Sequence, residues 1–257
     1  MSIHWKSGLL TRIIYDTWLM HSYLGKNIKH NHMHQVNIIT HVISGSLGLI
    51  VGIIALLSVK GGRVHNKSGR YFLLLMVVVI LTGLIGVFIF GRNTFLLVIT
   101  VLSGYVAFSG YRTLKDKSNK PKALDIGVAI TSLVVLFYFL YYFKQIGMIW
   151  APVIIYSTVG ALLLVVTYDF IRYLIPTKTY KKHKLWLYEH IYKMTSAFAA
   201  LLAAFSGTVL DDYQPHSQYI PSALGIMIII GFMIYVARKG LKKMPKRKNM
   251  KTEETFS

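Results

Sequence analysis

The chain has 257 residues, of which 29 are Lys or Arg and 9 are Asp or Glu, so its formal net charge is +20. Charged residues are only 15% of the sequence and hydrophobic residues are 54%, whereas an average soluble domain has about 25% charged residues. Apolar runs separate the basic clusters, which argues against a soluble domain and against a nucleic-acid-binding protein. Cysteine is absent, which excludes disulfides and thiolate catalysis. The composition therefore indicates a multi-pass membrane protein.

Seven stretches are apolar over their centres and have the 18 residues or more that a helix needs to cross a bilayer. We therefore predict an all-α integral membrane protein, a bundle of seven transmembrane helices over residues 37–239. An external tail over 1–36 precedes the bundle, and a basic, disordered cytoplasmic tail over 240–257 follows it. The predicted spans are Asn37–Val59, Tyr71–Phe90, Thr94–Tyr111, Ala123–Phe143, Met148–Tyr168, Leu185–Leu210 and Ile220–Ala237.

Basic residues alternate between the connections of the predicted bundle. One set of loops and the C-terminal tail hold 23 Lys and Arg residues, whereas the N-terminal tail and the other loops hold 6. Because basic loops stay on the cytoplasmic side, this division predicts a plasma-membrane protein with its N-terminus outside and its C-terminus in the cytoplasm. We expect the cytoplasmic face to contact anionic lipid head groups, and we expect no nucleic-acid partner.

The external tail contains a segment with helical amphipathicity. Its apolar side chains share one helical face, and Arg12 and Asp16 share another. The pattern predicts a helix over Leu9–Met20 that lies on the outer membrane surface. An unstructured tail is the alternative interpretation.

Small residues recur at helical spacing in two of the predicted spans, a pattern that lets neighbouring helices approach closely. We predict that spans one and six form the central packed pair through these faces. Ionisable residues enter the spans only near their ends, which disfavours an ion-coupled transporter. The two faces hold His41, Gly45, Gly48 and Gly52 in span one, and Ser196, Ala200, Ala203 and Gly207 in span six.

Three short motifs carry a resemblance to a known family. They are His41-x-x-x-Gly45, Lys60-Gly61-Gly62-x-x-His65-x-x-x-Gly69-Arg70 and Trp186-x-x-x-His190-x-x-x-Met194. The sequence resembles an uncharacterised family of predicted bacterial multi-pass membrane proteins. The resemblance implies an integral membrane protein and supplies no reaction. It marks His41, His65 and His190 as the histidines to consider.

Two of these histidines suggest a cofactor. A haem b is held by two axial histidines from different helices, and His65 and His190 both belong to the cytoplasmic side of the predicted bundle. Lys60, Arg63 and Arg70 could then offset the haem propionates. This hypothesis makes the protein a haem b or quinone-linked electron-transfer protein, with His41 as a further cofactor-binding candidate.

A divalent metal site at the outer face is a second hypothesis. His41 lies near the outer end of span one, and Asp211, Asp212 and His216 follow span six on the same side. Imidazole and carboxylate groups suit zinc and related ions.

The leading interpretation is structural. Histidines at membrane ends hydrogen-bond to neighbouring helices, and Glu189 and Lys193 form a pair at helical spacing. The chain has no nucleophile elbow, phosphate-binding loop or dinucleotide fingerprint, so an enzymatic role is disfavoured. The sequence thus favours a membrane structural or partner protein that associates with other membrane proteins.

Overall fold

The computed structural model describes residues 4–91, 95–146 and 152–239, with side chains from residue 31 onward. Within these residues every regular element is a helix, as predicted, and no strand is present. Helices suit apolar sequences because each backbone group finds its partner within the same segment. The elements are α1 (His4–Leu57), α2 (Arg63–Phe88), α3 (Phe95–Lys115), α4 (Ala123–Ile146), α5 (Pro152–Ile171), the 3₁₀ turn η1 (Arg172–Leu174), α6 (Thr177–Lys182), α7 (Leu185–Val209), the 3₁₀ turn η2 (Asp211–Tyr213) and α8 (His216–Lys239).

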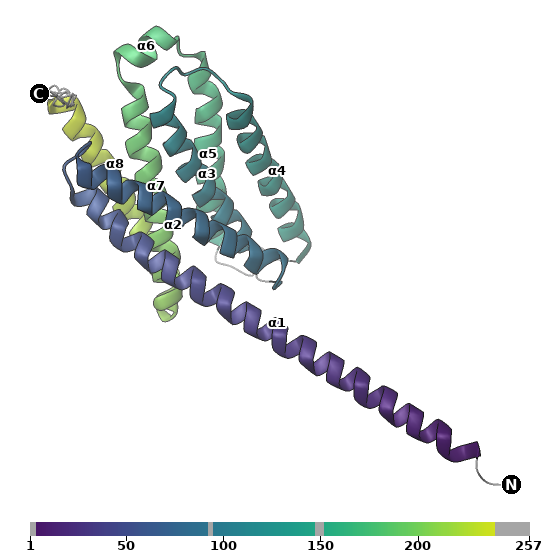
Figure 1. The fold of residues 1–257 in the computed structure, drawn as a ribbon. Helices are drawn as coiled ribbons and strands as arrows, with labels where there is room; N and C mark the ends of the chain where they lie inside the picture. The colour runs from purple at the N-terminus through teal and green to yellow at the C-terminus, as the bar shows by residue number, and fades with distance from the viewer. Residues whose placement is uncertain (1–3, 92–94, 147–151, 240–257) are drawn as a thin grey trace, which may run out of the picture.

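The long helices run up and down the bundle, and α1 extends beyond it as one continuous helix (Figure 1). The loop between α1 and α2, the short helix α6 and the C-terminal end of α8 lie at the same end of the bundle. Helix α1 includes the predicted amphipathic segment Leu9–Met20, whose side chains lie outside the described residues. The predicted disordered tail over 240–257 also lies outside them.

Among the residues that the structure describes, six helices are long and apolar enough to cross a membrane. Helix α7, which corresponds to the sixth predicted span Leu185–Leu210, is 25 residues long but is not among these six, because its first half carries Glu189 and Lys193 and its second half is rich in alanine. Six of the seven predicted spans are therefore found by length and composition. They are Asn31–Leu57, Arg63–Phe88, Leu97–Lys115, Ala123–Gln145, Ile155–Leu174 and His216–Arg238.

Several helices begin or end up to eight residues away from the predicted bounds. Helix α2 begins at Arg63 rather than at Tyr71, because its first two turns are polar and hydropathy does not mark where they start. A tight turn at Gly61, whose φ of 76° is in the left-handed region, connects this helix to α1. The apolar run thus locates each span, and local turn chemistry sets its ends.

The glycines on the small face of α1 make close contacts with α7, but the α7 side chains that they contact are large. A Cβ atom at Gly52 would lie 2.6 Å from the ring of Phe198, and one at Gly48 would lie 3.2 Å from Leu201. These α7 side chains therefore fill the space that the α1 glycines leave open. Helix α1 also packs along the whole of α2, its neighbour in the hairpin.

On α7, Gly207 of the predicted small face contacts α8 and not α1. A Cβ at Gly207 would lie 2.5 Å from Gln218 of α8, and a Cβ at Gly225 of α8 would lie 2.4 Å from Ala199. The predicted contact between two small faces is therefore wrong on the α7 side. Sequence spacing identifies a small face but does not say which helix covers it.

The close contact at Gly52 gives a test of this packing. We expect Gly52→Leu to destabilise the folded protein by about 1–3 kcal/mol, because the added side chain would collide with Phe198. The matched control is Gly231→Leu, since a Cβ at Gly231 has no neighbour within 4 Å. Thermal unfolding in detergent measures both variants, and equal midpoints would contradict the α1–α7 contact.

Candidate functional site

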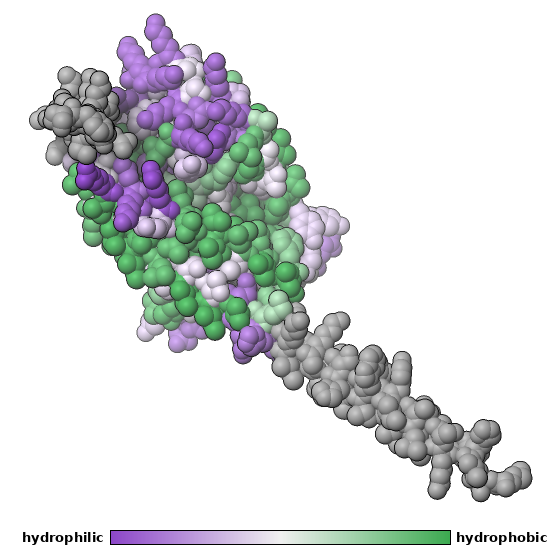
Figure 2. Space-filling view, viewed as in Figure 1, coloured by the Kyte–Doolittle hydropathy of each residue, from purple (hydrophilic) through white to green (hydrophobic). Residues whose placement is uncertain are grey.

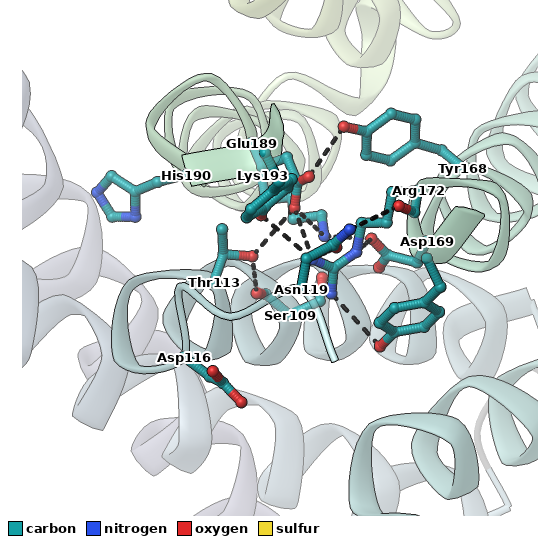
Figure 3. Close-up of polar contacts among 12 residues, drawn as sticks. Ser109, Thr113, Asp116, Asn119, Tyr168, Asp169, Arg172, Glu189, His190 and Lys193 are labelled. Carbon is teal, nitrogen blue, oxygen red and sulfur yellow. Dashed lines mark hydrogen bonds and ion pairs between the residues drawn. The ribbon is translucent and has the colours of Figure 1, made fainter. Parts of the chain in front are cut away.

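Four charged side chains from α5, η1 and α7 gather inside the bundle, near the end that carries α6 (Figure 3). Lys193 is fully buried at 0% exposure, and Glu189 is 3% exposed. Asp169 and Arg172 are buried beside them. Two acidic and two basic groups make the cluster neutral overall, which is the condition under which charges can be kept away from water. We call these four residues the charge cluster.

Each basic group of the charge cluster contacts both carboxylates. The Lys193 Nζ atom lies 2.5 Å from Asp169 Oδ1 and 3.7 Å from Glu189 Oε2. The Arg172 Nε atom lies 3.1 Å from Asp169 Oδ1, and its Nη1 atom lies 3.2 Å from Glu189 Oε2. The four groups therefore form a closed network rather than two separate pairs.

Helical spacing explains how two segments distant in sequence supply this network. Asp169 and Arg172 are three residues apart where α5 passes into η1, and Glu189 and Lys193 are four residues apart on α7. Residues at these spacings lie on the same face of a helix. Each segment thus presents one acidic and one basic group to the other.

Hydroxyl groups from neighbouring helices complete the network. The Tyr105 hydroxyl, from the middle of α3, donates to Asp169 Oδ2 at 2.8 Å. The Tyr168 hydroxyl donates to Glu189 Oε1 at 3.0 Å, and the Thr113 hydroxyl lies 3.4 Å from Glu189 Oε2. All four carboxylate oxygens of the cluster therefore have partners, which reduces the cost of burying them.

The loop between α3 and α4 adds further contacts at the end of the network that is nearest to α6. The Asn119 side chain donates to the carbonyl oxygens of Arg172 at 2.7 Å and Ile175 at 2.9 Å. Arg172 Nη1 lies 3.3 Å from the hydroxyl of Tyr180, which belongs to α6 and is fully buried. Burial raises the pKa of the Tyr180 phenol above its usual value, and the nearby Glu189 carboxylate raises it further. Tyr180 therefore stays neutral and acts through hydrogen bonding.

Two further ion pairs hold the same loop. Arg112 contacts both oxygens of Asp125, at 2.6 and 3.0 Å, and so ties α3 to α4. The Lys122 ammonium, 2.7 Å from Asp116, holds the pKa of that carboxyl well below its usual range. Both pairs are more exposed than the charge cluster, so each contributes less to stability than a buried pair.

The space beside the charge cluster is small. A cavity of about 10 Å³ lies between α3, α4 and α5 and is bordered by Tyr105, Ser109, Asp169 and Arg172. That volume holds about one water molecule. The side chains of the charge cluster therefore contact one another and leave no space there for a substrate.

The predicted cofactor histidines lie near the same end of the bundle, and each contacts a backbone carbonyl of another helix. His65 Nδ1 lies 3.0 Å from the carbonyl oxygen of Ala55, and His190 Nδ1 lies 3.4 Å from that of Gly110. His190 points away from the charge cluster (Figure 3), so it does not take part in that network.

The residues predicted for an outer metal site are not gathered. His41 Nδ1 lies 2.8 Å from the Thr82 hydroxyl of α2, whereas Asp211 and Asp212 are exposed in η2. His216 packs against the ring of Tyr219 at 5.2 Å between ring centroids. Within the described part of the chain, no three histidine or acidic side chains are placed to share a metal ion. The geometry assigns His41 a contact between α1 and α2, and a metal site remains a prediction without support.

The sequence contained part of the signal for the charge cluster. The spacing of Glu189 and Lys193 is visible in the sequence, but their partnership with Asp169 and Arg172, 17 to 24 residues away, is not predicted from it. A signal is present, because Asp169 and Arg172 follow one predicted span three residues apart, and a second pair of opposite charges four residues apart lies near the start of the next. Tyr105 had no such signal, since a single tyrosine in an apolar span is ordinary.

Comparison of the chain with known protein families, with curated proteins and with solved structures finds no match.

Removing one member of the charge cluster tests its contribution to stability. We expect Lys193→Met to destabilise the protein by about 3–5 kcal/mol, because one buried carboxylate would then lack a countercharge. The double variant Lys193→Met/Asp169→Asn restores neutrality and should recover part of the loss. Thermal unfolding in detergent provides the measurement.

The control for this series is Lys181→Met, which removes a lysine that is exposed on α6. It should leave the unfolding midpoint nearly unchanged. A Lys193→Met midpoint equal to that of the control would show that the charge cluster does not stabilise the fold.

Proposed function

We propose that the chain is a seven-span protein of the plasma membrane with its N-terminus outside and its C-terminus in the cytoplasm. In this proposal the charge cluster locks the helices together, and the bundle acts as a structural partner of other membrane proteins. The observation that carries it is the neutral network around Lys193, in which all four carboxylate oxygens have partners and which leaves space for about one water molecule. A transport or catalytic site would need space for a substrate among these groups.

The position of α7 supports seven spans rather than six. Helix α7 runs from α6 to the opposite end of the bundle, and α8 returns from there (Figure 1). The polar residues that lower its hydropathy, Glu189 and Lys193, are buried against other parts of the protein and do not face lipid. A helix with such partners can cross a bilayer even though its composition alone is not apolar enough.

The distribution of surface residues supports the proposed orientation. On the face of the bundle drawn in Figure 2, a broad area is hydrophobic, and hydrophilic residues are gathered over α6 and the neighbouring loops. Exposed lysines of this region include Lys117, Lys120, Lys178 and Lys181. Loops rich in lysine and arginine remain in the cytoplasm, where they face anionic head groups.

Reporter fusions test the topology. A reporter after Ser257 should behave as cytoplasmic, and a reporter inserted between Asp211 and Gln218 should behave as external. Six spans, with the N-terminus outside and α7 remaining on the cytoplasmic side, would place the Asp211–Gln218 reporter in the cytoplasm and the reporter after Ser257 outside. Alkaline phosphatase and green fluorescent protein, fused in parallel at the same sites, report opposite sides of the membrane. One of the two therefore gives a signal whichever side a site lies on.

Haem binding at His65 and His190 is the second candidate function. The observation that favours it is that both Nδ1 atoms face backbone carbonyls, so both Nε2 atoms are directed elsewhere. In histidine ligands of metals, the ring nitrogen that does not bind the metal usually donates a hydrogen bond to a carbonyl or carboxylate in this way. A bound haem would be held by His65 and His190 and would supply one-electron transfer.

An absorption spectrum decides between the two candidates. If the histidines are structural, protein purified from cells with ample haem will be colourless, and His65→Ala will cost only about 1 kcal/mol of stability. If they bind haem, the protein will show a Soret band that both His65→Ala and His190→Ala abolish or shift. We expect the colourless preparation.

A further inference from the structure

An apolar groove opens between α2, α3 and α4, away from the buried face of the bundle. Its volume is about 430 Å³, which falls within the usual range for small-molecule sites of about 300–1,000 Å³. The walls include Ile80, Val101, Val128 and Val135. In a membrane-inserted bundle a groove with this lining faces lipid and excludes water.

The hydroxyl groups in the groove do not require a polar ligand. Thr131 donates to the carbonyl oxygen of Gly127, and Ser132 donates to that of Val128, both at 2.8 Å. Their hydrogen bonds are thus made within α4 itself. The groove therefore presents an apolar surface to whatever occupies it.

A glycine in α4 helps keep the groove open. A Cβ atom at Gly127 would have no neighbour within 4 Å, so the space beside this residue is not used by packing. Across the groove, a Cβ at Gly104 of α3 would lie 3.4 Å from Ile80 of α2, an ordinary contact. The unfilled space is therefore on the α4 side.

The dimensions of the groove favour an acyl chain over a helix. Its α4 wall runs from Ala123 to Val135, a rise of about 18 Å at 1.5 Å per residue. A partner helix of that length and about 10 Å in diameter would occupy on the order of 1,400 Å³. A groove of about 430 Å³ is far smaller, and a flexible hydrocarbon chain fits it better.

The charge at one end of the groove identifies the head group. Ala123 lines the groove and directly follows Lys122, and Lys120 is three residues before it; both lysines are exposed. The two acidic side chains of this region are already paired, Asp116 with Lys122 and Asp125 with Arg112. The remaining positive charge attracts a phosphate-bearing, net anionic head group.

We propose that this groove binds one acyl chain of an anionic phospholipid, with the lipid phosphate at Lys120. The inference rests on the membrane insertion proposed above. Its test uses purified full-length protein in detergent, so a failure here is distinguishable from a failure of the reporter topology.

Native mass spectrometry of the protein with phosphatidylglycerol provides the first measurement. We expect wild-type protein to retain one phosphatidylglycerol and much less phosphatidylcholine with the same acyl chains. Gly127→Leu fills the groove and should lower retention about tenfold. The control Gly160→Leu adds the same side chain on α5, where a Cβ also has no neighbour within 4 Å, and should retain the lipid.

The head-group contact has its own variant. Lys120→Glu should weaken phosphatidylglycerol retention and leave the small phosphatidylcholine signal unchanged. Equal retention of both lipids by wild-type protein would overturn the anionic assignment. Equal lipid retention by Gly127→Leu and Gly160→Leu would overturn the proposal that the groove binds the acyl chain. A polypeptide that co-purifies with wild-type protein but not with Gly127→Leu would also overturn it.

A second measurement keeps the proposal testable if Gly127→Leu does not fold. The chain has no native cysteine, so Thr131→Cys places a single thiol inside the groove with little change in volume. Phosphatidylglycerol should protect this thiol from a maleimide and should not protect Ile130→Cys, the neighbouring exposed position. Equal modification of both thiols in the presence of the lipid would overturn the proposal.

Discussion

The burial of Lys193 is the constraint on which the packing of this bundle depends. An ammonium group with no exposure to solvent is stable only with a countercharge. Asp169 and Glu189 supply that charge, and Arg172 then balances the second carboxylate. Moving α5 along α7 by one helical turn would separate these groups, so the network fixes the register between the two helices.

Close backbone approach is the second condition for this network. A Cβ at Gly110 of α3 would lie 3.0 Å from the Cβ of Lys193, so the glycine lets α3 lie directly against α7. At that distance the Tyr105 and Thr113 side chains of α3 reach Asp169 and Glu189. Packing by small residues and satisfaction of buried charges therefore depend on each other, as expected where hydrophobic burial between helices contributes little.

Hydropathy and loop charge were enough to predict an all-helical bundle and the approximate position of each span. Helix ends such as Arg63 were missed, because polar first turns look like loops in an apolar count. The charge cluster was half predicted, since the Glu189–Lys193 spacing is local whereas the contact with Asp169 depends on tertiary packing. The small face of α7 was recognised but assigned to the wrong neighbour, because spacing carries no information about which helix covers a face.

Tyr105 joins the two features that distinguish this bundle. Its hydroxyl donates to Asp169 of the charge cluster, and the residue also lines the apolar groove between α2, α3 and α4. A tyrosine suits this position because its ring is apolar and its hydroxyl needs a partner when buried. Since the hydrogen bond fixes the ring, the inner wall of the groove is held in place by the network. The groove is therefore preformed rather than created by a ligand, which lowers the entropy lost on binding.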